Sequence, residues 1–153
     1  MTRKWMLIVD DDPDHAFLAT RTIASHDPAI EVALCATGAE AIETLRAAAG
    51  APPQAIFVDI RLGSESGLDL IGRLRASPGC AHAPIAVLTA CATDESRTEA
   101  LLRDASAYVC KPLTPERLSA LLCGTGFHWE MKDLPTNLAR YHSLRRAGPA
   151  GGA

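Results

Sequence analysis

Charged or polar residues follow four apolar runs of the chain, and together they could bind a metal ion and a phosphoryl group. Asp10 and Asp11 follow WMLIV, Asp59 follows QAIFV, Thr89 follows PIAVL, and Lys111 follows AYVC. Three carboxylates close together would raise one another's pKa unless a cation lies among them, and oxygen ligands of this kind suit Mg²⁺. Because Mg²⁺ usually binds through one or two carboxylates, one aspartate is left as a nucleophile that can form an aspartyl phosphate. The Thr89 hydroxyl and the Lys111 ammonium would supply a hydrogen-bond donor and a positive charge to the phosphoryl oxygens.

A parallel sheet would bring these residues together. Five short apolar runs alternate with segments of helical pattern, and we expect strands over 5–9, 30–35, 54–58, 84–88 and 107–110. Four of the runs are almost continuously apolar, which is typical of strands covered on both faces, whereas Glu31 interrupts the second and predicts a partly exposed edge strand. The alternation predicts a doubly wound α/β fold, in which ligands bind beyond the carboxyl ends of the strands.

Residues that cap helices precede each helical pattern. Asp12-Pro13 predicts an N-cap followed by proline at the first helical position, so we interpret Asp12 as a cap rather than a metal ligand. Asp14 would add a favourable negative charge in the first turn of the same helix. The other expected helix starts are Thr37, Ser66, Thr93 or Asp94, and Thr114-Pro115.

The length and composition fit one domain with an extension. The chain has 153 residues, of which we assign 1–123 to the domain and 124–153 to a C-terminal extension. Within the extension, 136–146 is expected to form a short amphipathic helix, and the final AGPAGGA is expected to be disordered. The five cysteines are an odd number without paired spacing, so we expect reduced thiols.

The charge of the chain favours neither nucleic acid nor an anionic membrane as a partner, because the net charge is only -3. The apolar runs are too short to span a bilayer, and the first residues lack the pattern of a signal peptide, so we expect a cytoplasmic protein. The five histidines show no ligand spacing and are interpreted as structural or surface residues.

Four segments together resemble the receiver domain of response regulators in two-component signalling, the CheY-like family. They are LIVDDD, IFVDIRLGSESGLDLI, VLTA and AYVCKPLT, and the resemblance covers about residues 4–123. It implies a flavodoxin-like, five-stranded parallel sheet of order 2-1-3-4-5 with five flanking helices. It also implies that the chain is not an enzyme for other substrates but a domain that catalyses its own phosphorylation and dephosphorylation.

The resemblance implies a role for each residue of the acidic cluster. Asp59 matches the phospho-accepting aspartate, which also contributes to the metal site. Asp11 matches the direct Mg²⁺ ligand, and Asp10 matches the acidic neighbour that acts through a metal-bound water. The backbone carbonyl of Arg61 matches a further protein ligand of the metal.

The resemblance also implies a conformational switch. Thr89 and Lys111 match the switch hydroxyl and the lysine that pairs with the phosphoryl group. Tyr108 matches an aromatic residue whose rotamer follows phosphorylation, and we expect it to move inward; the alternative is a half-buried aromatic without a switching role. Lys111-Pro112 matches a pair that the family often joins by a cis peptide bond.

Three positions depart from the family pattern. Gly63 stands where proline is usual, which should loosen the loop after the acceptor. Asp104 stands where a glycine often ends the fourth helix, and aspartate tolerates positive φ better than most residues. Cys91, two residues after Thr89, is neither acidic nor an amide, so the hydrolysis rate of a phosphorylated form cannot be taken from relatives.

These implications predict a stand-alone receiver that a sensor histidine kinase or a histidine phosphotransfer protein phosphorylates on Asp59. A downstream protein would bind the face formed by the fourth helix, fifth strand and fifth helix, and 124–153 would serve as a docking or homodimerising arm. Two alternatives stay open: a small Mg²⁺-dependent phosphatase or phosphotransferase with Asp59 as nucleophile, and a phosphate-independent interaction domain. The enzyme would often carry a second aspartate two residues after the nucleophile, where this chain has Arg61.

Overall fold

A five-stranded parallel sheet forms the centre of the protein. The computed structural model describes residues 3–48, 50–90 and 93–122. The strands of the sheet are β1 (Trp5–Val9), β2 (Glu31–Cys35), β3 (Ile56–Asp59), β6 (Ile85–Thr89) and β7 (Ala107–Cys110). They lie in the order β2-β1-β3-β6-β7, and all neighbouring pairs are parallel. The predicted doubly wound fold with strand order 2-1-3-4-5 is therefore confirmed.

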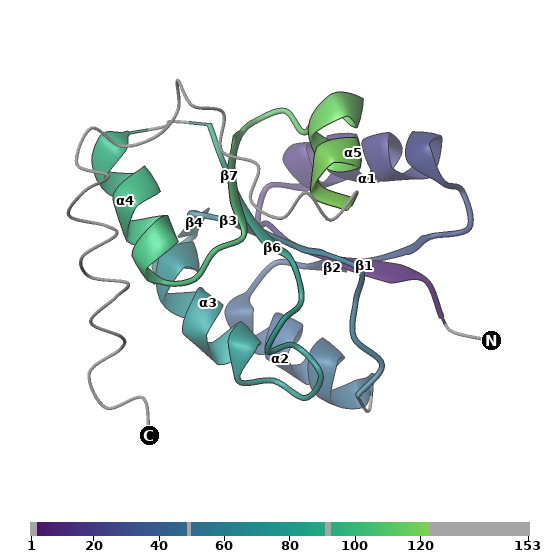
Figure 1. Ribbon diagram of the computed structural model, residues 1–153, viewed down its shortest axis with the longest axis horizontal. Helices are drawn as coiled ribbons and strands as arrows, with labels where there is room; N and C mark the ends of the chain where they lie inside the picture. The colour runs from purple at the N-terminus through teal and green to yellow at the C-terminus, as the bar shows by residue number, and fades with distance from the viewer. Residues whose placement is uncertain (1–2, 49, 91–92, 123–153) are drawn as a thin grey trace.

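Helices cover both faces of this sheet (Figure 1). They are α1 (Pro13–His26), α2 (Gly38–Ala47), α3 (Gly67–Arg75), α4 (Asp94–Leu102) and α5 (Pro115–Leu122). One buried cluster joins a face of the sheet to α1 and α5, and the other joins the opposite face to α2, α3 and α4. Because side chains of one strand alternate between the two clusters, β1 is buried along its whole length, as its continuous apolar run predicts.

The predicted helix starts are confirmed. Asp12 is the N-cap of α1 and accepts hydrogen bonds from the backbone amides of Asp14 and His15 at 2.9 and 3.4 Å. Its main role is therefore structural, and the first of these bonds is the largest cause that lowers its pKa. Thr37, Ser66 and Thr93 cap α2, α3 and α4 in the same way.

The expected edge strand is also confirmed. β2 lies at one edge of the sheet and is buried only at its last residue, Cys35, whereas β1 beside it is wholly buried. Glu31 at its start is exposed and forms an ion pair with Arg3 at 2.9 Å. A charged residue on an edge strand discourages pairing with another chain.

A small hairpin after β3 was not predicted. It consists of β4 (Arg61–Leu62) and β5 (Glu65–Ser66), which pair antiparallel around a turn where Gly63 has a φ of 60°. Strands of two residues are too short for any periodicity in the sequence. The turn has a defined geometry in this structure, so the looser loop expected from Gly63 stays a prediction.

Two smaller predictions are confirmed. Asp104 has a φ of 64°, the positive value expected where a glycine is common, and the Lys111-Pro112 peptide bond is cis. Cys35, Cys80 and Cys110 are free thiols, as expected.

The predictions for Cys91, for Cys123 and for the extension 124–153 with its short helix lie outside the described residues. No helix in the described part of the chain is long and apolar enough to cross a membrane.

Candidate functional site

The carboxyl ends of three strands bring Asp10, Asp59 and Lys111 into contact. Asp10 follows β1, Asp59 ends β3, and Lys111 follows β7. The Lys111 Nζ atom lies 2.8 Å from Asp10 Oδ2 and 2.7 Å from Asp59 Oδ2. The convergence predicted from the strand ends is thus observed for these three residues, although Asp10 and Lys111 are 101 positions apart in the sequence.

This charged cluster is largely removed from solvent. The side chains of Asp10, Lys111 and Asp59 expose 3%, 9% and 13% of their surface. Burial raises the pKa of Asp10, and the hydrogen bond from Lys111 offsets this only in part. Burial alone would lower the pKa of Lys111, but the hydrogen bonds to both aspartates and their negative charges together outweigh burial, so the net shift is upward. Lys111 is therefore held as a cation beside Asp59.

Backbone amides fix the other oxygen of each aspartate. Asp10 Oδ1 accepts a hydrogen bond from the amide of Asp12 at 2.9 Å, and Asp59 Oδ1 accepts one from the amide of Arg61 at 3.1 Å. Each carboxylate is thus bound on one side by Lys111 and on the other by its own chain two residues further on. This arrangement restricts the rotamers of both aspartates.

The acidic residues fit a divalent cation by charge and by donor type. Asp11 is exposed, and its Oδ2 atom would lie 3.7 Å from a Cβ atom at Gly63, so its carboxylate faces the turn of the β4–β5 hairpin. Asp10, Asp11 and Asp59 carry three negative charges against one positive charge on Lys111, which leaves two negative charges. Carboxylate and carbonyl oxygens are the donors that Mg²⁺ prefers. The cluster could hold such an ion, with Asp11 and the Arg61 carbonyl as candidate ligands at its open side.

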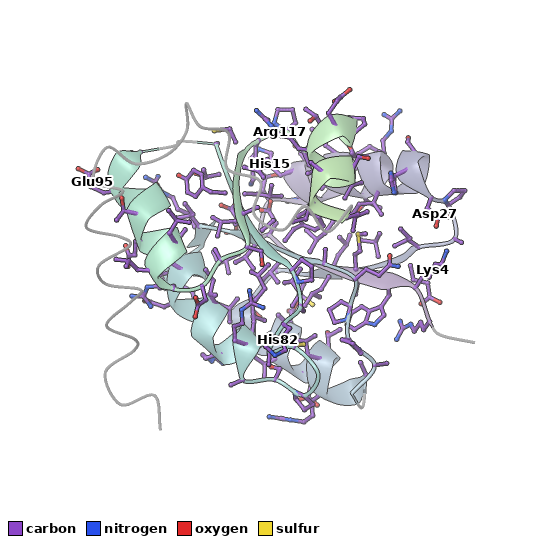
Figure 2. All side chains as sticks on the ribbon, in the orientation of Figure 1. Lys4, His15, Asp27, His82, Glu95 and Arg117 are labelled. Carbon is purple, nitrogen blue, oxygen red and sulfur yellow. The ribbon has the colours of Figure 1, made fainter. Side chains whose placement is uncertain are left out.

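His15 is a member of the cluster that the sequence analysis missed. Its Nδ1 atom lies 2.8 Å from Lys111 Nζ. Ligand atoms of Asp10, His15 and Asp59 all lie within 4.8 Å of one another, and each of the three residues contacts Lys111 Nζ. The interpretation of every histidine as structural or surface is therefore wrong for His15. The sequence places His15 in the first turn of the helix that follows Asp10-Asp11, and this position could have indicated that it lies near the cluster. His15 is labelled in Figure 2.

Thr89 and Tyr108 lie on β6 and β7, the two strands that follow β3 in the order of the sheet. Thr89 ends β6, is 5% exposed, and accepts a hydrogen bond at its carbonyl from the amide of Lys111 at 2.8 Å. The ring of Tyr108 is only 6% exposed, and its hydroxyl is hydrogen-bonded to Ser96 Oγ of α4. The half-buried aromatic of the alternative interpretation is therefore wrong about burial, and the inward movement on phosphorylation stays a prediction.

Gly67 is a second residue that the sequence analysis missed. A Cβ atom at this position would lie 1.8 Å from the carbonyl oxygen of Asp59, and the Gly67 amide donates to the carbonyl of Ile60 at 2.7 Å. The start of α3 therefore packs directly against the backbone of Asp59. Such an approach is possible only without a side chain.

A pocket of about 320 Å³ adjoins the cluster on the side of α1. It is lined by His15, Leu18, Ala19, Ala90, Lys111, Pro112 and Leu113. Leu18 is also exposed at the surface, as is Phe17 beside it. A partner that reaches Asp59 from this side would meet apolar surface next to Lys111.

Comparisons with known proteins identify the family to which these features correspond. The response regulator receiver domain family matches residues 6–122. The transcriptional regulatory protein KdpE of Mycobacterium tuberculosis is 34% identical over 119 residues, which are 76% of this chain and 48% of KdpE. The chain thus spans about half the length of this curated relative.

Solved structures show the same fold. A putative response regulator from Chloroflexus aurantiacus is 27% identical with a TM-score of 0.68, and the match covers 78% of this chain and 98% of that one. A response regulator from Burkholderia pseudomallei, with a phosphorylated aspartic acid and a calcium ion, is 26% identical with a TM-score of 0.65. That match covers 96% of this chain and 76% of the other.

Proposed function

This chain belongs to the response regulator receiver family of two-component systems, and from this premise we propose that it accepts a phosphoryl group on Asp59. The observation that carries the proposal is the contact of Lys111 with both Asp59 and Asp10. Asp59 is a largely buried carboxylate beside a fixed cation, and phosphoryl transfer depends mainly on positioning and on neutralising charge around the transferred group. Family membership favours this function over the phosphatase and phosphotransferase alternative.

In the proposed reaction, a carboxylate oxygen of Asp59 attacks the phosphorus atom of the donor. The bond from phosphorus to a donor histidine nitrogen breaks as the new bond to oxygen forms, and the imidazole leaves. Lys111 would pair with a phosphoryl oxygen, and the Thr89 hydroxyl would donate a hydrogen bond to another.

We further propose that Mg²⁺ supports this reaction. Asp11 would bind the ion directly, Asp10 through a water molecule, and the carbonyl of Arg61 and Asp59 would complete the protein ligands. The ion would supply the positive charge that offsets the carboxylates and the incoming phosphoryl oxygens. The two uncompensated negative charges of the cluster and the bound calcium ion of the Burkholderia pseudomallei relative support this assignment.

Mass spectrometry of the intact protein tests the proposed function. After incubation with phosphoramidate and Mg²⁺, we expect the mass to increase by one phosphoryl group, and we expect little increase when the metal is removed with a chelator. Asp59→Asn keeps the size of the side chain but cannot form the acyl phosphate, so it should show no increase. An unmodified wild-type protein, or equal modification of Asp59→Asn, would contradict the proposal.

For the output, we propose that phosphorylation changes the face formed by α4, β7 and α5. Tyr108 of β7 is hydrogen-bonded to Ser96 of α4, so a movement of Thr89 or of the ring would reach the surface of α4. The donor would be a sensor histidine kinase or a histidine phosphotransfer protein, which could use the apolar surface at Phe17 and Leu18 beside the pocket.

The extension 124–153 is proposed as a homodimerising arm, because Phe127, Trp129, Leu138 and Tyr141 give it apolar side chains. Light scattering during size-exclusion chromatography should show a dimer for the full chain and a monomer for residues 1–123. The shortened chain keeps every residue of the two buried clusters. If the measured mass is the same multiple of the chain mass for the full chain and for the shortened chain, the arm does not dimerise the protein.

A further inference from the structure

We infer that His15 is a positioning residue for Lys111: its Nδ1 atom accepts the third hydrogen of the ammonium group and so holds Lys111 across Asp10 and Asp59. The contact itself does not depend on the proposed phosphorylation. Its consequence for the rate of phosphorylation rests on that proposed function.

The ammonium group of Lys111 has as many hydrogen-bond partners as it has hydrogens. A lysine ammonium has three N–H donors and no acceptor. Lys111 Nζ has three partners, Asp10 Oδ2 at 2.8 Å, Asp59 Oδ2 at 2.7 Å and His15 Nδ1 at 2.8 Å. The ammonium is therefore fully satisfied with its side chain only 9% exposed. Without His15, the third hydrogen would point toward a pocket partly lined by Leu18, Ala19 and Leu113.

The contact defines the tautomer of the imidazole. Because the ammonium can only donate, Nδ1 must carry the lone pair and Nε2 the hydrogen. The nearest carboxylate oxygen to the same atom is Asp12 Oδ2 at 3.5 Å, which is too long to compete with the 2.8 Å contact. The imidazole thus holds Lys111 without adding a third carboxylate that would draw the lysine away from Asp59.

The first turn of α1 places the imidazole. His15 is the third residue of the helix, and its backbone amide donates to the capping side chain of Asp12. Its own side chain is 39% exposed, so a change there removes little packing. A substitution at this position can therefore report on Lys111 rather than on the fold.

Two substitutions of similar size distinguish the effect of the hydrogen-bond acceptor of His15 from the effect of the bulk of its ring. His15→Asn can place its Oδ1 atom near the position of Nδ1 and keep an acceptor for Lys111, whereas His15→Leu removes the acceptor. With phosphoramidate and saturating Mg²⁺, we expect His15→Leu to be phosphorylated about fivefold more slowly than wild type, the size of one lost hydrogen bond. His15→Asn should recover most of the rate. Urea unfolding of both variants should resemble that of the wild type.

The ammonium of Lys111 supplies a readout that does not need phosphorylation. In ¹⁵N-edited NMR spectra at low temperature, a held ammonium exchanges slowly enough to give a Nζ signal, which Lys111→Met assigns by its loss. We expect this signal in wild type and in His15→Asn, and its broadening or loss in His15→Leu.

The two measurements distinguish the possible failures. A Lys111 signal that is the same in His15→Leu and in wild type overturns the inference, as does an unchanged rate of phosphorylation in His15→Leu. If wild type takes up no phosphoryl group while the signal still depends on the acceptor at position 15, the positioning contact stands and the proposed function fails.

Discussion

Gly67→Ala is expected to lower the free energy of unfolding by about 2–3 kcal/mol, the cost of forcing extra volume into a packed site. The new Cβ atom would lie 1.8 Å from the carbonyl oxygen of Asp59, 2.8 Å from its carbonyl carbon and 3.0 Å from the Cα atom of Ile60. All three neighbours are backbone atoms, so no side-chain rotation can relieve the contact. The start of α3 must move away from β3, or the end of β3 must move.

Either movement displaces Asp59. The amide of Arg61 donates a hydrogen bond to Asp59 Oδ1. Ile60, which lies between these two residues in the sequence, accepts a hydrogen bond at its carbonyl from the Gly67 amide. The folded fraction of Gly67→Ala should therefore be phosphorylated more slowly than wild type under the same conditions.

Gly72→Ala is the matched control, because Gly72 lies in the same helix and a Cβ atom there would meet nothing within 4 Å. This substitution should raise the stability by about 0.5–1 kcal/mol, the usual gain from alanine in a helix interior. Urea unfolding followed by circular dichroism measures both changes. Equal stabilities of the two variants would show that the backbone of α3 can yield at no cost.

Those parts of the site that depend on strand direction could be predicted from the sequence. Asp10, Asp59 and Lys111 each follow an apolar run, and parallel strands place their carboxyl ends at one edge, so the three had to be neighbours. The different role of Asp12, compared with Asp10 and Asp11, could also be predicted from the sequence. Pro13 marks the start of a helix, and the residue before it is then the N-cap.

The missed features depend on distances that no periodicity encodes. His15 contacts Lys111 only because the first turn of α1 aims its ring at the end of β7, and Gly67 matters only because two backbones nearly touch. The burial of Tyr108 depends on how closely α4 packs against the sheet, and the weakly apolar sequence of α4 does not specify that packing. Tertiary contacts between elements decide all three.

Arg75→Met is expected to destabilise the protein by about 2–4 kcal/mol, because it removes the donor for several partly buried acceptors at once. The guanidinium of Arg75, at the end of α3, donates to the carbonyl of Asp104 at 2.8 Å, to Ser106 Oγ at 3.1 Å and to the carbonyl of Ala83. Burial lowers the pKa of Arg75, but a guanidinium stays charged at neutral pH. Methionine has a similar length and an apolar end, so it fills space without replacing any of these bonds.

The hydrogen bonds of Arg75 join two loops that precede neighbouring strands of the sheet. Ala83 precedes β6, and Asp104, with its positive φ, precedes β7. Ser106 Oγ also accepts a hydrogen bond from the amide of Ile85 at 3.0 Å, so the same network fixes the start of β6. Because β6 and β7 carry Thr89 and lead to Lys111 at their other ends, a loss of order here would reduce the stability of the strands that present the site.

Arg73→Met is the control for this prediction, because Arg73 lies in the same last turn of α3 but is exposed, and its ion pair with Glu65 is as long as 3.7 Å. An exposed pair of this kind contributes little, so the change should stay within about 0.5 kcal/mol. Urea unfolding of Arg75→Met, Arg75→Lys and Arg73→Met compares the three. Lysine keeps the charge but cannot reach several carbonyls with one planar group, so Arg75→Lys should fall between the other two. If Arg75→Met unfolds at the same urea concentration as Arg73→Met, the network does not stabilise the fold and the two loops are held by the strands alone.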